Sequence, residues 1–228
     1  IKIGNAWDIK CHGVQTRLFD RHGLASKKAT DELVEKIKEI KPDIIHLHNL
    51  HGYYLNIEIL FHYLAAADIP VVWTLHDCWP MTGHCAYFSF IGCDKWKTQC
   101  RHCPQKKGYP ASYLKDRSYK NYQLKKELFT SVPKMTLVPV SNWLANIVKE
   151  SFLKTYPIKT IYNGVDTSVF APCSTAKIRE KYKIPTDTFV ILGVASVWSE
   201  LKGLKDFIRL SESLKENEII ILVGLTDK

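Results

Sequence analysis

Hydrophobic and polar positions follow two patterns along this chain. Short, nearly uninterrupted apolar runs alternate with stretches in which apolar residues recur every three or four positions. The first pattern predicts buried strands and the second predicts amphipathic helices, and their alternation is typical of a parallel α/β sheet. We predict strands at residues 43–47, 71–75, 135–140, 159–162, 189–194 and 218–223.

Four helices are predicted between these strands. One is expected over residues 29–40, where Pro42 prevents its continuation, and another over 56–67, where Asn56 is able to cap the first turn. Because the strand at 71–75 is apolar at nearly every position, we expect burial on both faces and therefore a doubly wound sheet. The remaining helices are predicted at residues 142–153 and 203–214.

Two segments interrupt this rhythm. Residues 78–110 exceed the usual length of a connection, so we expect them to be functional or to be held by something other than a hydrophobic core. The pattern also lapses around residues 170–173, which predicts an interdomain linker. The expected domains are residues 1–171, which include the insertion 78–110, and residues 172–228.

The composition of the 228 residues is that of an ordinary soluble globular protein, with 46% hydrophobic and 24% charged residues. No apolar run approaches the roughly 20 residues of a membrane span. Seven cysteines, an odd number, argue against a disulfide-stapled secreted scaffold and favour a reducing compartment. Because the chain begins at Ile1 without a methionine or a leader, we expect a fragment.

The net charge of +9 is concentrated in one region. Residues 94–127 hold ten Lys and Arg against three acidic residues. Such a patch suits a nucleic acid, an anionic membrane surface or a phosphorylated ligand, and a solvated helix face is an equally good explanation.

Four cysteines of the insertion are candidate metal ligands. Their spacing ends in C-x-x-C, and four thiolates are able to close a tetrahedral structural zinc site that leaves no position for substrate. Free buried thiols and disulfides are the open alternatives. The four residues are Cys85, Cys93, Cys100 and Cys103.

Polar residues follow five of the predicted strands. Ligands of open α/β sheets bind beyond the carboxyl ends of the strands, so these residues are the candidate site, although each alone also fits a helix cap or a turn. The signatures of dinucleotide-binding, P-loop and serine hydrolase enzymes do not occur. The candidates are His46, His48, Asn49, His51, Gly52, His76, Asp77, Ser141, Asn142, Asn163, Gly164, Asp166, Ser196, Glu200, Lys202 and Gly203.

Five segments of the sequence form a further pattern. They are DIIHLHNLHG (43–52), WTLHDCWP (73–80) with TGHC (82–85), VSNW (140–143), NGVD (163–166) with Phe170, and VASVW (194–198) with Lys202 and Gly203. Together and in this order, these segments resemble the retaining glycosyltransferases of family 4, and the cysteine insertion resembles the bacterial cell-envelope and exopolysaccharide branch of that family.

The resemblance implies a GT-B architecture of two Rossmann-like domains, in which sugar passes with retention from a nucleotide-sugar donor to an acceptor. It implies no catalytic metal. His76 matches the catalytic histidine that binds the donor sugar and supports charge at the anomeric carbon, and Lys202 with Gly203 matches the donor diphosphate site. The substrate cleft is expected to include His48, Asn49, His51, Asp77, Ser141 and Asn163.

The chain departs from the family pattern in three respects. Ser196 stands where the family commonly has an arginine on the diphosphate. The family's first strand and glycine-rich loop would precede Ile1, and its glutamate pair would follow Lys228. We therefore expect an α/β chain with the Rossmann-like parallel sheets of a GT-B glycosyltransferase, truncated at both ends and inactive alone.

The expected partners are a nucleotide-sugar donor and a glycan or lipid-diphosphate acceptor, in the cytoplasm and at the inner face of the membrane. The alternative function is a zinc-containing nucleic-acid-binding module that uses the basic segment 95–126. Such a module has no need of polar residues beyond five strands, so no nucleic acid is expected. This segment contains four tyrosines that are able to stack on bases, namely Tyr109, Tyr113, Tyr119 and Tyr122.

Overall fold

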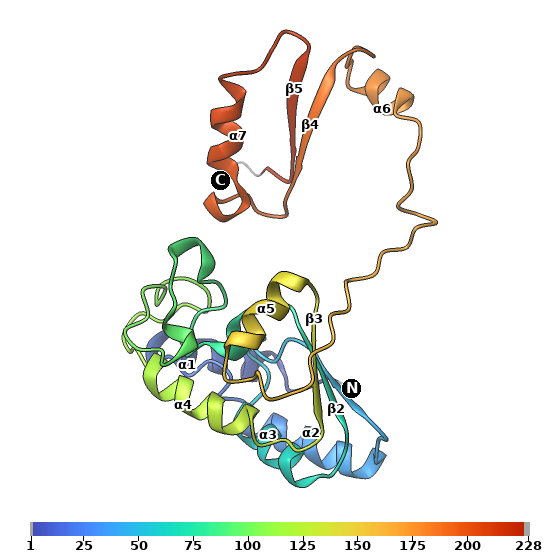
Figure 1. Cartoon of the computed structure of the whole chain (residues 1–228). Helices are drawn as coiled ribbons and strands as arrows, with labels where there is room; N and C mark the ends of the chain where they lie inside the picture. Colours follow the sequence, from blue (N-terminus) through green and yellow to red (C-terminus); the bar gives the residue numbers. More distant parts are fainter. Residues whose placement is uncertain (1, 226–228) are drawn as a thin grey trace. The chain divides into compact units, whose positions relative to one another are not determined.

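The computed structural model describes residues 2–225, which form two compact units (Figure 1). The larger unit ends at Gly164 and the smaller begins at Val165. The boundary predicted between residues 171 and 172 lies in the irregular segment that follows Gly164. Among the described residues, no helix is both long and apolar enough to cross a membrane.

A three-stranded parallel sheet forms the centre of the larger unit. Its order is β1 (Ile45–Leu47), β2 (Val71–Leu75) and β3 (Met135–Pro139). The register places Val71 of β2 beside Ile45 and Met135. The predicted parallel α/β sheet is confirmed, since the carboxyl ends of all three strands meet at one edge.

The prediction of a regular strand at residues 159–162 is wrong. The structure has one parallel bridge there, between Leu137 and Ile158. The N–H groups of Lys159 and Ile161 donate to carbonyl groups of β3 at 2.9 and 3.2 Å, so this segment runs beside β3 without forming a regular strand.

One face of the sheet carries the core of the unit. Val71, Trp73 and Leu75 are each 1% exposed. The Trp73 ring lies 5.5 Å from Phe61 of α3 (Ile57–Ala66) and 4.9 Å from Phe129 of α4 (Ser118–Phe129), between ring centroids. Aromatic clusters of this kind contribute much of a core's hydrophobic stabilisation.

The other face of the sheet is less completely buried than predicted. His46 is exposed, Val72 is half-buried, and Thr74 is 9% exposed. The Nε2 atom of His46 lies 2.8 Å from Oγ1 of Thr74, which gives this face a polar contact between β1 and β2. The expectation of strands buried on both faces is therefore only partly right.

All four predicted helices are present within a few residues of their expected bounds. The Asn56 side chain accepts from the Ile59 N–H at 3.1 Å, as its role as a cap requires. Three further helices within residues 2–225 were not predicted. The predicted helices correspond to α2 (Lys27–Ile40), α3, α5 (Asn142–Glu150) and α7 (Leu204–Ser211), and the unpredicted ones are α1 (Ala6–Phe19), α4 and α6 (Ala176–Lys181).

The insertion 78–110 contains three short 3-10 helices and hydrophobic contacts of its own. Phe88 and Trp96 stack with ring centroids 4.9 Å apart, and both belong to the same buried apolar cluster as β2. Hydrophobic contacts with the core of the unit therefore hold part of this segment. The 3-10 helices are η1 (Trp79–Met81), η2 (Ser89–Ile91) and η3 (Lys95–Lys97).

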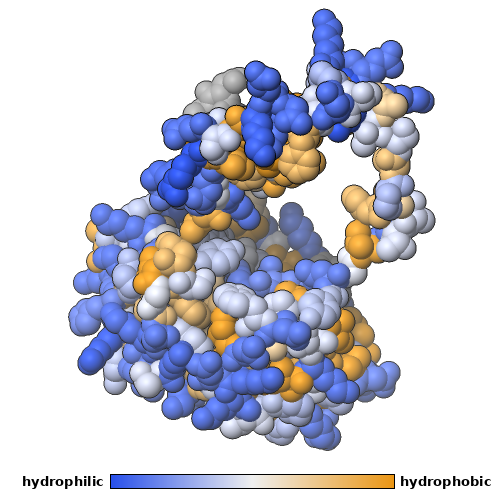
Figure 2. All heavy atoms as spheres, turned by 45° about the horizontal axis from the view of Figure 1, so that its top comes forward, coloured by the Kyte–Doolittle hydropathy of each residue, from blue (hydrophilic) through white to orange (hydrophobic). Residues whose placement is uncertain are grey.

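The smaller unit pairs β4 (Phe189–Val194) with β5 (Glu218–Val223) in parallel. Gly193 allows this packing, because a Cβ there would lie 2.7 Å from Leu222 and from Trp198. Much apolar surface in the unit is exposed, as the orange area between charged side chains in Figure 2 shows. Phe189, for example, is 62% exposed.

Candidate functional site

Two histidines meet at the carboxyl edge of the sheet. His48 follows β1, His76 follows β2, and Nδ1 of His48 lies 3.0 Å from Nε2 of His76. The parallel register brings them together, since Leu47 is paired with Trp73. Both rings are exposed, and the bond couples their tautomers because one nitrogen donates and the other accepts.

The electrostatic environment keeps one member of this pair uncharged at neutral pH. Partial burial, together with nearby His46 and His76, lowers the pKa of His48 below its usual value. A neutral His48 is a fixed hydrogen-bonding partner that sets the orientation of the His76 ring.

A second pair from the same two loops is closed to solvent. His51 and Asp77 are joined by an Nε2 to Oδ2 distance of 2.8 Å, and both side chains are 9% exposed. The other His51 nitrogen lies 3.2 Å from the Tyr109 hydroxyl, and the other Asp77 oxygen accepts from the Trp79 N–H at 2.9 Å. This pair therefore anchors the loops that carry the exposed histidines.

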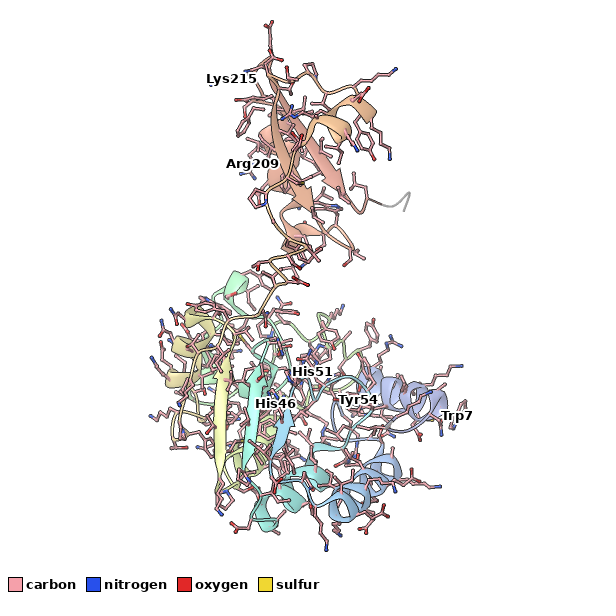
Figure 3. The ribbon with its side chains drawn as sticks, turned by 90° about the vertical axis from the view of Figure 1, so that its right-hand side faces the viewer. Trp7, His46, His51, Tyr54, Arg209 and Lys215 are labelled. Atoms are coloured by element: carbon pink, nitrogen blue, oxygen red, sulfur yellow. The ribbon has the colours of Figure 1, made fainter. Side chains whose placement is uncertain are left out.

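The loop after β1 is held by its own contacts. The Tyr54 hydroxyl donates to the Asn49 carbonyl at 2.6 Å, and Figure 3 shows Tyr54 in the same unit as His46 and His51. Gly52 is needed in this loop, because a Cβ would lie 2.7 Å from the Tyr54 ring.

Four of the six predicted cleft residues, together with the predicted catalytic residue His76, surround one small cavity at this edge of the sheet. Ser141 and Asn163 do not line it. Ser141 caps α5, where its Oγ accepts from the Leu144 N–H at 3.1 Å, and Asn163 is exposed in the segment after β3. The predicted residues that do line the cavity are His48, Asn49, His51, His76 and Asp77.

The predicted diphosphate residues lie at the ends of elements in the smaller unit. Ser196 and Lys202 are exposed, and Lys202 ends η4 (Glu200–Lys202). Gly203 has φ +76° and directly precedes α7 as its N-cap, so the turn uses a left-handed conformation that favours glycine. The smaller unit thus presents an ammonium group beside a helix N-terminus.

The four cysteines of the insertion line a single cavity of about 10 Å³, together with His84. All are free thiols. A hydrogen bond with Cys85 lowers the pKa of Cys103 to about 7, and burial raises the pKa of Cys100 to about 11. Within residues 2–225, no three His, Cys, Asp or Glu side chains already form a complete metal-binding group.

The basic segment is not one continuous surface, which corrects the expectation for 95–126. Tyr122 is 1% exposed and its hydroxyl donates to the Trp96 carbonyl at 2.9 Å, and Lys125 is 2% exposed. Tyr119 is 54% exposed and lines an open groove of about 670 Å³. The cationic side chains of that groove are Arg21, Lys115, Arg117 and Lys120.

Sequence reasoning missed several buried polar residues. Lys125 was counted with the basic patch, although its spacing from Tyr122, Leu128 and Phe129 places it on the buried face of α4. Asp20 was also missed, since its partner His84 lies 64 positions along the chain. Spacing within the sequence gives no signal for such a pair.

Comparison with known proteins shows the family of this chain. Residues 8–169 match the family model described as Glycosyltransferase Family 4. The chain belongs to Glycosyltransferase Family 4. The resemblance noted from the sequence segments is thereby confirmed, and the matched residues of this family 4 chain include both histidine pairs and the four insertion cysteines.

One relative of this family 4 chain comes from Escherichia coli (strain K12). It is named as a colanic acid biosynthesis glycosyl transferase, WcaC, and is 32% identical over 164 residues. The alignment covers 68% of the chain and 38% of the relative, so the chain spans well under half the length of that protein.

Proposed function

We propose that this family 4 chain is part of a retaining GT-B glycosyltransferase. The enzyme transfers a hexose from a nucleotide-sugar donor to a glycan or lipid-diphosphate acceptor of exopolysaccharide synthesis. The observation that carries the proposal is the hydrogen-bonded His48 and His76 pair, which lies at the carboxyl edge of a parallel sheet within the matched residues.

His76 is assigned to the donor sugar. As the bond from the anomeric carbon to the diphosphate breaks, positive charge develops on the sugar ring and negative charge on the leaving group. The bond to His48 fixes the His76 ring through Nε2 and leaves Nδ1 for a sugar hydroxyl. A pre-oriented polar group of this kind stabilises developing charge without reorganisation during the reaction.

Lys202 and Gly203 are assigned to the donor diphosphate. The Lys202 ammonium compensates the charge that appears on the leaving group, and the N-terminal end of α7 favours an anion. Ser196 is exposed in the same unit and supplies a neutral hydroxyl where the family commonly has an arginine. The diphosphate is therefore bound with one less cationic side chain.

The basic groove is assigned to the acceptor. Four cationic side chains with Phe19 and Tyr119 offer both charge and apolar contact, which suits a diphosphate attached to a lipid. This assignment brings the groove to the anionic inner face of the membrane.

Calorimetric titration of the purified protein encoded by the reading frame that contains this chain, with UDP, GDP and their hexose derivatives, tests the proposal. We expect one nucleotide-sugar to bind, and Lys202→Ala to weaken that binding at least tenfold. Lys177→Ala, which removes an exposed lysine of α6, serves as the matched control and leaves binding unchanged. If that folded protein binds none of these compounds, or binds them equally after Lys202→Ala, the proposal is contradicted.

A further inference from the structure

The cysteine cluster carries an inference that does not depend on sugar transfer. Four side chains with sulfur atoms, separated by up to 18 positions in sequence, line the same small cavity. Its volume of about 10 Å³ is close to the least that holds one water-sized sphere. The cavity is therefore too small for a substrate and has the size of a single ion. The four residues are Cys85, Cys93, Cys100 and Cys103.

The backbone of Gly83 packs closely against the side chain of Cys100. A Cβ on Gly83 would lie 2.9 Å from that of Cys100, so this close approach requires glycine.

A buried lysine adjoins the cluster without a carboxylate partner. Lys125 is 2% exposed, its Nζ donates to the Trp79 and Thr82 carbonyls at 2.8 and 3.0 Å, and it lies 3.3 Å from the centre of the Trp79 ring. None of the ion pairs found among residues 2–225 includes it. A buried charge is costly unless an opposite charge lies nearby.

A buried histidine nitrogen also lacks a partner at this cavity. His84 lines the cavity and is 1% exposed. Its Nδ1 lies 2.6 Å from the Asp20 carboxylate, whereas its Nε2 has no hydrogen-bond partner in the structure. Buried polar atoms are nearly always satisfied, so an unpartnered nitrogen indicates a missing group.

We propose that Cys85, Cys93, Cys100 and Cys103 bind one zinc ion, with buried Lys125 beside it as the charge-compensating group. Four thiolates around Zn²⁺ carry a net charge of −2, which is the negative charge that Lys125 lacks. The thiols turn inward from their present positions to close the set, since no three ligands are yet arranged as a metal site.

The ligand set selects both the metal and its role. Soft thiolate ligands in a tetrahedral arrangement favour zinc over magnesium, calcium or manganese. Four protein ligands leave no coordination position for a substrate, so the ion is structural and holds residues 83–103 against α4.

Metal analysis of the chain tests the proposal directly. The chain is purified with a reductant and without chelators, and zinc is measured by inductively coupled plasma mass spectrometry. We expect about one zinc per chain. Replacement by Co²⁺ is expected to give tetrahedral visible bands and thiolate charge-transfer bands whose intensity corresponds to four sulfur ligands. A folded chain with neither zinc nor cobalt bands, or with these cysteines in disulfides, overturns the proposal.

Substitutions identify the ligands. Cys93→Ser and Cys103→Ser are each expected to abolish stoichiometric zinc binding, whereas the double variant Cys11→Ser, Cys173→Ser retains it. The last two cysteines lie outside the cavity. If the ligand variants do not fold, the zinc content and the cobalt spectrum of the unsubstituted chain still test whether the cysteines bind zinc. Full zinc retention by folded ligand variants contradicts the assignment.

The role of Lys125 is tested separately. Lys125→Met removes the charge and keeps the length of the side chain, so we expect zinc affinity, measured by competition with a chelating dye, to fall about 10- to 100-fold. A merely structural lysine would leave that affinity unchanged while altering the stability of the metal-free chain. Lys126→Met, at the exposed neighbouring position, is the control. Equal affinity in both variants contradicts this part of the proposal.

Discussion

Asp20 and His84 join two distant parts of the larger unit through a buried contact of 2.6 Å between Oδ1 and Nδ1. Asp20 directly follows α1, whereas His84 lies in the insertion after β2. The other Asp20 oxygen accepts from the Arg117 N–H at 2.7 Å, just before α4. One carboxylate thus connects three segments that share no regular secondary structure.

Asp20→Asn is expected to destabilise the chain by about 3 kcal/mol, because both carboxylate oxygens accept from buried donors and the new amide places an NH₂ group against one of them. Equilibrium urea unfolding measures this change. Asp94→Asn is the control, since its exposed carboxylate pairs with Lys97 at 3.3 Å and is expected to contribute less than about 1 kcal/mol. Equal stability of the two variants would show that the buried pair contributes little.

The pH dependence of stability should carry a contribution from His12. Burial lowers the pKa of His12 to about 4, and the Gly23 N–H donates to its Nε2 at 3.0 Å, which requires an unprotonated nitrogen there. Above pH 6.5 the ring is neutral in both folded and unfolded chains. As the pH falls from 6.5 to 4, only the unfolded chain takes up the proton, so stability decreases by about 3 kcal/mol.

His12→Gln is expected to reduce this acid-dependent loss, because the new side chain does not titrate. Unfolding is measured at several pH values between 4 and 7, and the difference between variant and parent chain isolates the His12 contribution. His62→Gln, at an exposed position of α3, is expected to follow the parent curve. A slope for His12→Gln that matches the parent chain would refute the assignment.

The proposed function makes a further prediction for the exposed histidine pair. His76→Ala is expected to lower kcat at least 100-fold in the reading frame that contains this chain, because the group beside the donor sugar is lost. His48→Ala is expected to lower kcat about tenfold, because this substitution removes only the hydrogen bond that orients the His76 ring. Steady-state assays of sugar transfer measure both, with His62→Ala as the control. Unchanged kcat in His76→Ala would exclude it from catalysis.

The sequence was most informative where local pattern and tertiary structure agree. The apolar run at 71–75 predicted β2 and its strand-end His76, and Asn56 marked the start of α3. Helix α1 was missed because its buried residues are His12 and Thr16, while Trp7 is 71% exposed, so no apolar face distinguishes it. Its polar contacts depend on partners far along the chain.

The candidate site likewise contains some contacts that the sequence predicts and others that it does not. Parallel strands place their carboxyl ends together, so the meeting of His48 and His76 follows from the predicted topology. The pairing of His51 with Asp77 and Tyr109 depends on loop conformation, which apolar periodicity does not describe. The burial of Lys125 is likewise a tertiary effect, since a lysine in a basic run ordinarily indicates a solvated face.

Gly83 provides a sharp test of the packing between the insertion and α4. A Cβ at this position would lie 1.9 Å from the Ser118 carbonyl oxygen, a backbone atom that moves only with the helix. Gly83→Ala is therefore expected to destabilise the chain by about 3 kcal/mol. Gly13→Ala is the matched control: a Cβ there meets nothing within 4 Å, and the higher helix propensity of alanine should stabilise α1 by up to about 1 kcal/mol. Urea unfolding of both variants measures the two opposite changes, and a stable Gly83→Ala chain would mean that the insertion does not lie against α4 as described.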